Sequence, residues 1–82
     1  MRIDKFLSTV NLVKRRAISE DMLEHNVVFL NGQPVKKAKE VKVGDIIEIR
    51  YIEYIDKYEV LSIPTTKSTP KSKQTEYVKK LD

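Results

Sequence analysis

Apolar residues in the first quarter of the chain recur at helical spacing. Positions 3, 6, 7 and 10 are apolar and follow the i, i+3, i+4, i+7 pattern of one helix face, which predicts a first helix over Arg2–Leu12. Ile18 and Met22 mark the apolar side of a second helix, expected over Lys14–His25. Asn26 follows this helix and can take the left-handed conformation that ends helices.

Beyond Asn26 the pattern becomes that of short β-strands. Val27–Leu30 is a run of branched and aromatic residues, which favours a strand. Asn31–Gly32 then predicts a tight type I′ hairpin turn. The chain returns as a strand over Gln33–Val35, and Pro34 places that strand at a sheet edge because proline lacks a backbone donor.

Two further strands are expected in the middle of the chain. Gly44–Asp45 is a turn signal, and Ile46–Ile52 after it alternates as a strand, with positions 47, 49 and 51 on one face. Its antiparallel partner is expected over Tyr58–Ile63, with the turn between them around Tyr54–Lys57. The order of helix, helix, hairpin and strands predicts a small α+β domain.

The composition changes from Pro64 onward. Thr65–Thr75 consists mainly of Thr, Ser, Lys, Pro and Gln, so we expect this stretch to be flexible. One short terminal helix is expected over Thr75–Leu81. The predicted organisation is therefore one domain over residues 1–63 and a flexible basic tail over residues 64–82.

Length and composition exclude several classes of protein. A chain of 82 residues allows one small domain. It contains no cysteine and one histidine, which excludes disulfides and the usual zinc sites, and no cofactor is expected. The longest apolar run, Val27–Leu30, is far too short to cross a bilayer, and the N-terminus is not that of a signal peptide. A cytoplasmic location is the default expectation.

The net charge of +4 is unevenly distributed along the chain. Residues 1–39 contain eight Lys or Arg and four Asp or Glu, residues 40–64 contain three and six, and residues 65–82 contain five and two. The local charges are thus +4, −3 and +3. A local basic patch sets the field that a polyanion meets, so the first half of the chain is the candidate region.

Three adjacent cations, Lys14–Arg16, stand where the second helix is expected to begin. Positive charge at a helix N-terminus opposes the helix dipole, whereas anions are favoured there. The triplet therefore indicates a binding site for phosphate groups. On a helical wheel Arg16 faces water, and the stems of Lys14 and Arg15 can turn outward. The plain alternative is a solvated helix face.

Four segments follow one another in a defined order: Arg2–Leu7, Lys14–Ala17, Val27–Gly32 and Val41–Ile47. Together they resemble the alpha-L RNA-binding domain, the module first defined in ribosomal protein S-four. The resemblance covers about residues 1–52 and rests on the order and spacing of the segments. It implies two N-terminal helices packed on a small antiparallel sheet, and an RNA-binding function.

Within this family the chain is most similar to short stand-alone members of the RqcP type, which are related to the heat-shock protein fifteen type. The resemblance implies a monomeric, ribosome-associated quality-control protein. Such a protein binds large-subunit rRNA and peptidyl-tRNA on obstructed large subunits, and supports C-terminal tailing of the nascent chain by a partner factor. The alternative within the family is a heat-shock protein fifteen type rescue factor for large subunits that carry nascent chain-tRNA.

The resemblance places RNA contacts on Arg2, Lys5 and the triplet. Lysines in the basic connector after the hairpin either continue this patch or are merely solvated, and the tail lysines are best explained as keeping a flexible end soluble. The candidate RNA-binding residues are Arg2, Lys5, Lys14, Arg15, Arg16, Lys36, Lys37 and Lys39.

Other classes of function are less well supported by the residues. No nucleophile lies near a base and no paired carboxylates stand out, so an enzyme is not expected. His25 is interpreted as a helix-end residue. Tyr51, Tyr54 and Tyr58 can stack on bases, although packing is favoured for Tyr51 and Tyr58. A protein-interaction module that uses the acidic residues 40–64, or an accessory domain of an RNA-modifying enzyme, remains an alternative.

Overall fold

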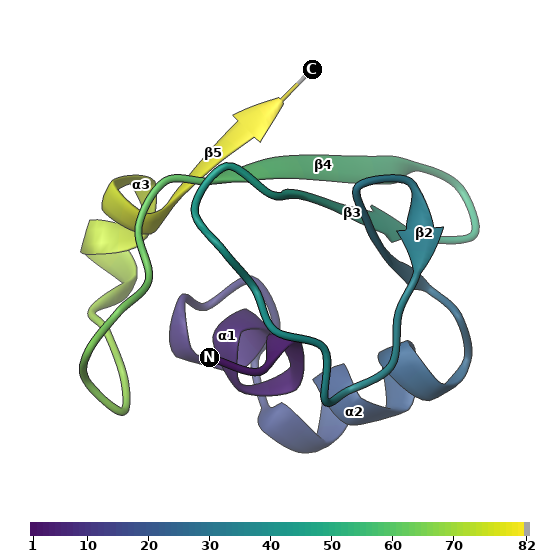
Figure 1. The fold of residues 1–82 in the computed structure, drawn as a ribbon, viewed down its shortest axis with the longest axis horizontal. Helices are drawn as coiled ribbons and strands as arrows, with labels where there is room; N and C mark the ends of the chain where they lie inside the picture. Colours follow the sequence, from purple (N-terminus) through teal and green to yellow (C-terminus); the bar gives the residue numbers. More distant parts are fainter. Residues whose placement is uncertain (82) are drawn as a thin grey trace.

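The computed structural model describes residues 1–81, and it has an α+β fold, as predicted. Helices α1 (Ile3–Thr9) and α2 (Arg16–Glu24) lie on one side of a five-stranded antiparallel sheet (Figure 1). The strand order is β2-β1-β3-β4-β5. The strands are β1 (Val28–Leu30), β2 (Gln33–Pro34), β3 (Ile46–Arg50), β4 (Ile55–Val60) and β5 (Val78–Leu81).

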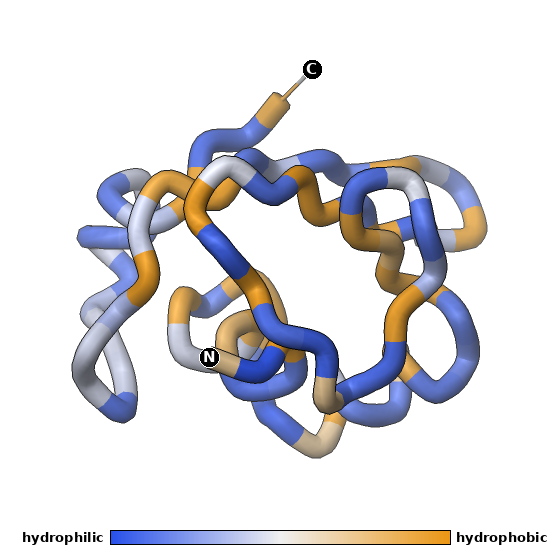
Figure 2. Tube along the Cα trace, viewed as in Figure 1, coloured by the Kyte–Doolittle hydropathy of each residue, from blue (hydrophilic) through white to orange (hydrophobic). Residues whose placement is uncertain are grey.

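The core lies between the two helices and the inner face of the sheet. Helix α1 and its C-cap, Val10, contribute four fully buried apolar side chains at the predicted spacing, and α2 contributes Leu23. Strand residues alternate between this core and the outer face, which Figure 2 shows as a change between apolar and polar colours along the trace. The buried apolar residues of α1 and the sheet are Ile3, Phe6, Leu7, Val10, Val28, Leu30, Ile47, Ile49, Val60 and Val78.

Both helices end at an asparagine in the left-handed conformation. Asn11 has φ 65° and Asn26 has φ 57°. After α2, the N–H of Val27 donates to the Met22 carbonyl (3.0 Å), and the N–H of Asn26 donates to the Leu23 carbonyl (3.3 Å), a Schellman arrangement. The role predicted for Asn26 is confirmed. Helix α1 ends earlier than predicted, because Asn11 turns the chain in the same way.

Helix α2 differs from the sequence prediction in its start and its buried face. It begins at Arg16, because Arg15 is extended (φ −138°) and precedes the helix. Ile18 was expected on the apolar side but is 45% exposed, whereas Ser19 is fully buried against α1. A small, hydrogen-bonded serine at this contact lets the two helices approach closely. Met22 packs at the margin of the core.

The hairpin between β1 and β2 follows the prediction. Asn31 and Gly32 have φ values of 51° and 83°, the signs that a type I′ turn requires. Strand β2, which contains Pro34, lies at an edge of the sheet, as predicted. The turn at Gly44 is also present, with φ 93°.

The turn between β3 and β4 lies earlier than the sequence indicated. Tyr51 donates its N–H to the Tyr54 carbonyl (2.8 Å), and β4 begins at Ile55. The predicted turn around residues 54–57 is therefore wrong. Asp56 and Lys57 resemble turn residues, but each is a strand residue paired with a residue of β3.

The last part of the chain forms a strand where a helix was expected. A 3₁₀ turn (η1, Lys71–Lys73) and the short helix α3 (Gln74–Tyr77) lead into β5 (Val78–Leu81), which pairs with β4. The predicted helix over Thr75–Leu81 is wrong beyond α3, because Val78 enters the core opposite Val60.

Polar contacts join the tail to the end of α1. The Thr69 hydroxyl donates to the Thr9 carbonyl (2.8 Å), and the Gln74 amide donates to the Val10 carbonyl (2.9 Å). These contacts satisfy carbonyl groups that a helix end leaves free. The division of the chain at residue 63 and the flexibility of residues 65–75 stay predictions.

Candidate nucleic-acid interface

The segment after the hairpin lies along the start of α1. Ile3 donates its N–H to the Lys39 carbonyl (2.7 Å), and Arg2 forms an isolated antiparallel bridge with Glu40. The N-terminal ammonium of Met1 donates to the Glu40 carboxylate at 2.8 Å, and this hydrogen bond holds the pKa of that carboxyl below its ordinary value. The basic connector is thereby fixed beside the first residues of the chain.

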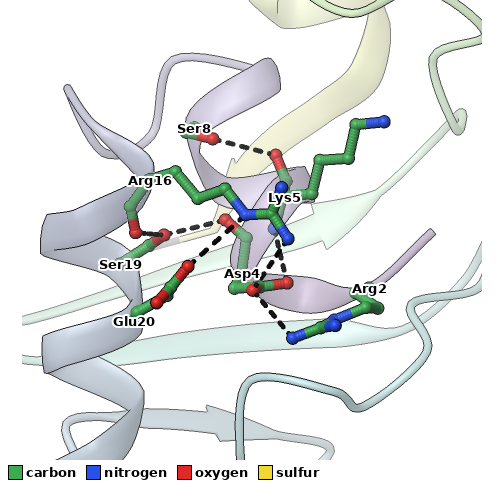
Figure 3. A network of polar contacts seen from close by, with 7 residues as sticks. All are labelled: Arg2, Asp4, Lys5, Ser8, Arg16, Ser19 and Glu20. Carbon is green, nitrogen blue, oxygen red and sulfur yellow. Dashed lines mark hydrogen bonds and ion pairs between the residues drawn. The ribbon is translucent and has the colours of Figure 1, made fainter.

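A single buried carboxylate lies at the centre of this region. The Asp4 side chain has no exposed surface, and its Oδ1 accepts the backbone N–H of Lys5 at 2.8 Å. Its Oδ2 accepts hydrogen bonds from Nη2 of Arg2 (3.1 Å) and from Nη2 of Arg16 (3.3 Å), as Figure 3 shows. A buried charge needs such partners, so the arrangement satisfies Asp4 fully.

The contact between the helices keeps Arg16 close to Asp4. Ser19 Oγ lies 2.7 Å from the carbonyl oxygen of Asp4 and 2.7 Å from that of Arg16. Its hydroxyl can donate a hydrogen bond to either oxygen. Nε of Arg16 also lies 3.5 Å from a carboxylate oxygen of Glu20, one helical turn along α2 (Figure 3). Two arginines from separate parts of the chain thus meet on one acceptor.

Both arginines remain accessible to a ligand. The side chain of Arg2 is 42% exposed and that of Arg16 is 47% exposed. Arg16 was predicted to face water, and its side chain is about half exposed, although its guanidinium also contacts Asp4 of α1. The remaining N–H groups of each planar guanidinium can contact phosphate oxygens.

The other predicted cations surround this pair in different ways. Lys5 is partly exposed, and its side chain extends away from Asp4 (Figure 3). Lys14 and Arg15 are exposed in the loop before α2, and residues 1–81 contain no ion pair to either. Lys14 precedes α2 and Arg15 is its N-cap, so only Arg16 lies within the helix, while the charge of Arg15 still stands at the positive end of the helix dipole.

The connector lysines do not all have the same environment. Lys36 Nζ contacts the Glu24 carbonyl (3.4 Å) and the Asn26 side-chain oxygen (3.2 Å), so it caps the end of α2. Lys37 and Lys39 are exposed. The capping role of Lys36 was not visible in the sequence, because it depends on contacts 10 and 12 residues away.

His25 and the tyrosines lie apart from the arginine pair. Nδ1 of His25 contacts the Asp21 carbonyl at 2.8 Å, and this hydrogen bond raises the pKa of His25, as suits a helix-end residue. The rings of Tyr51 and Tyr54 stack at 4.7 Å. Tyr51 and Tyr58 pack against the core, as favoured, and burial raises the pKa of both.

Residues 1–81 contain no group of three or more His, Cys, Asp or Glu side chains placed to hold a metal ion. No helix within this part of the chain is long and apolar enough to span a membrane.

Comparisons with known proteins agree with this fold and identify the family of the chain. A profile of the S4 domain matches residues 1–47. A curated relative from Helicobacter pylori (strain J99), named RQC P-site tRNA stabilizing factor, is 47% identical over 78 residues, which span 95% of this chain and 93% of the relative. A protein of the same name from Bacillus subtilis (strain 168) is 35% identical over 51 residues, which span 62% of this chain and 59% of the relative.

Two solved structures share the fold. The trimeric structure of Vibrio cholerae Heat Shock Protein 15 matches with a TM-score of 0.88 at 23% identity, over 99% of this chain and 81% of that one. The solution structure of a protein described as hypothetical matches with a TM-score of 0.86 at 44% identity, over 100% of this chain and 98% of that one. The chain therefore belongs to the S4-domain family and, within it, to the family of RQC P-site tRNA stabilizing factors.

Proposed function

We propose that this protein binds large-subunit rRNA and peptidyl-tRNA on obstructed large ribosomal subunits, and that it supports C-terminal tailing of stalled nascent chains. The observation that carries the proposal is the pair of partly exposed arginines held on buried Asp4. The relatives are named for stabilizing a P-site tRNA, and the matched S4 domain spans all eight candidate cations.

The proposed mechanism is binding without a chemical step. Arg2 and Arg16 would contact phosphates of a folded RNA backbone, with Lys5, Lys14 and Arg15 adding positive charge around them. Contacts to phosphate supply affinity through the release of counterions and make that affinity salt-dependent. The protein would recognise the shape of structured RNA more than its sequence. Holding a tRNA in this way requires no nucleophile or general base.

The finer parts of the proposal concern partners and location. We propose a monomer that associates with ribosomes in the cytoplasm and works beside a separate tailing factor. A heat-shock protein fifteen type rescue role would use the same RNA contacts.

A protein contact has its own support at the β3–β4 turn. There Ile52, Tyr54 and Ile55 are 104%, 57% and 53% exposed, away from the arginine pair. These apolar side chains suit a protein partner, because the acidic segment around them repels RNA.

The experiment compares two arginines that differ in place but not in exposure. Arg16 is 47% exposed and Arg50 is 49% exposed, and each contacts a carboxylate. Arg16→Ala should weaken binding to purified large subunits and to bulk tRNA, and it should lower the salt slope by about one unit. Arg50→Ala should leave both unchanged. Equal binding by the two folded variants and the unchanged protein would exclude the proposed interface.

A further inference from the structure

We infer that Asp4 is a positioning residue for RNA: its carboxylate, which RNA cannot reach, holds the guanidiniums of Arg2 and Arg16 at a fixed spacing for phosphate. The inference rests on the proposed function and assigns a role in RNA binding to a residue of the same negative charge as RNA. Asp4 is fully buried, so any effect that it has on binding acts through the two arginines.

The hydrogen-bond geometry converges on one atom. Oδ2 of Asp4 accepts Nη2 of Arg2 at 3.1 Å and Nη2 of Arg16 at 3.3 Å, while Oδ1 is occupied by the Lys5 N–H. Two guanidiniums this close repel each other unless a negative charge lies between them. The carboxylate therefore fixes both the distance and the orientation of the pair.

Fixing the arginines before binding favours affinity. A long arginine side chain loses much of its rotamer freedom when it grips a ligand, and a side chain that is already held loses less. The backbone supports the same geometry, since Arg2 is bridged to Glu40 and Arg16 opens α2. The spacing is set by the folded protein rather than by the RNA.

One edge of the Arg2 guanidinium is enclosed by the protein, although the side chain as a whole is partly exposed. Nε of Arg2 is buried and has no hydrogen-bond partner among the described residues. A buried donor without an acceptor is destabilising. The burial of Nε restricts the movement of the side chain, which agrees with a fixed Arg2.

Substitution of Asp4 distinguishes a positioning role from a simple charge effect, because the two predict opposite changes in the affinity for RNA. Asp4→Asn removes a negative charge beside the phosphate site, so charge alone predicts tighter binding of RNA. The asparagine offers one acceptor oxygen to the three donors that Asp4 satisfies. Positioning therefore predicts weaker binding, although the protein becomes more positive.

Glu20 provides a matched control. It also contacts Arg16, with Oε1 at 3.5 Å from Nε, but it is 40% exposed and makes no contact with Arg2. Glu20→Gln removes the same charge without releasing the pair. This variant should bind RNA as tightly as the unchanged protein, or slightly more tightly.

The test measures the affinity for purified bulk tRNA by fluorescence anisotropy at two salt concentrations, with circular dichroism to confirm folding. Asp4→Asn should bind at least about fivefold more weakly, since an oriented hydrogen bond between charged groups is at stake, and Glu20→Gln should not. Unchanged or tighter binding by Asp4→Asn, with Arg16→Ala weakened, overturns the positioning role alone. Unchanged binding by Arg16→Ala overturns the proposed interface and this inference together.

A second variant covers the case in which Asp4→Asn does not fold. Arg2→Lys combined with Arg16→Lys keeps both charges and removes the planar groups that Asp4 holds. If position matters, this variant binds tRNA several-fold more weakly at equal net charge. Binding equal to that of the unchanged protein overturns the inference.

Discussion

Two clusters in this protein contain the same number of charges of each sign but have different surroundings. In each, one carboxylate contacts two cations: Asp4 contacts Arg2 and Arg16, whereas Glu48 contacts Arg50 and Lys57. The four cationic side chains are similarly exposed, at 42%, 47%, 49% and 49%. The carboxylates differ, because Asp4 is fully buried and Glu48 is 13% exposed.

The two clusters also differ in what they join. The Asp4 cluster joins the start of α1 to the start of α2, and Asp4 and Arg16 are 12 positions apart in the sequence. The Glu48 cluster lies on the outer face of neighbouring strands, where the Arg50 guanidinium covers the Phe29 ring at 3.8 Å. The Phe29 ring thus covers one face of the Arg50 guanidinium, and the segment around Arg50 is acidic. The two clusters therefore differ in burial and in their neighbours rather than in the number of cations, and the proposed RNA interface depends on that difference.

Removal of each carboxylate tests the structural side of the comparison. Asp4→Ala leaves two guanidiniums and the Lys5 N–H without their acceptor, and should lower the free energy of unfolding by about 2–4 kcal/mol, since both arginines are partly exposed. Glu48→Ala should cost clearly less, because its partners are solvated and Arg50 keeps its contact with Phe29. Urea unfolding monitored by circular dichroism gives both values. Equal losses in the free energy of unfolding would mean that the burial of Asp4 does not strengthen its contacts.

A change in pH should have a smaller effect on stability, which acts through the Glu48 cluster. The hydrogen bond from Arg50 holds the pKa of Glu48 below its ordinary value of 4.5. Because the folded pKa is the lower one, the stabilisation is present above the unfolded pKa and is lost as the pH falls through the folded pKa. Glu48→Gln should therefore flatten the decline in stability between about pH 5 and pH 3. An unchanged acid profile in this variant would contradict the assignment.

Local sequence patterns predicted the elements whose stabilising contacts are close in the chain. The spacing of Ile3, Phe6 and Leu7 gave α1, and Asn31–Gly32 gave the hairpin with its turn type. The resemblance at residues 1–52 led to the S4 domain, whose profile matches residues 1–47. Each of these signals is carried by neighbouring residues.

The features that were missed depend on distant contacts. Strand β5 is defined by pairing with β4, about 20 residues earlier, and residues 75–81 alone resemble a weak helix. The sequence indicated Arg2 and Arg16 as separate candidates, but not their common acceptor. Asp4 lies in the first turn of α1, where the helix dipole favours an acid, and nothing local reveals that its carboxylate is buried. The RNA contacts of all eight candidate cations stay predictions.

The most direct test of the account follows the arginine side chains themselves. The chain has four arginines, so an NMR spectrum of their Nε–Hε groups is simple to assign by substitution. When purified bulk tRNA is added, the signals of Arg2 and Arg16 should shift or broaden at low salt, while the signal of Arg50 stays in place. A shift of the Arg50 signal with those of Arg2 and Arg16 unchanged would contradict the assignment of the RNA interface to the arginine pair on Asp4.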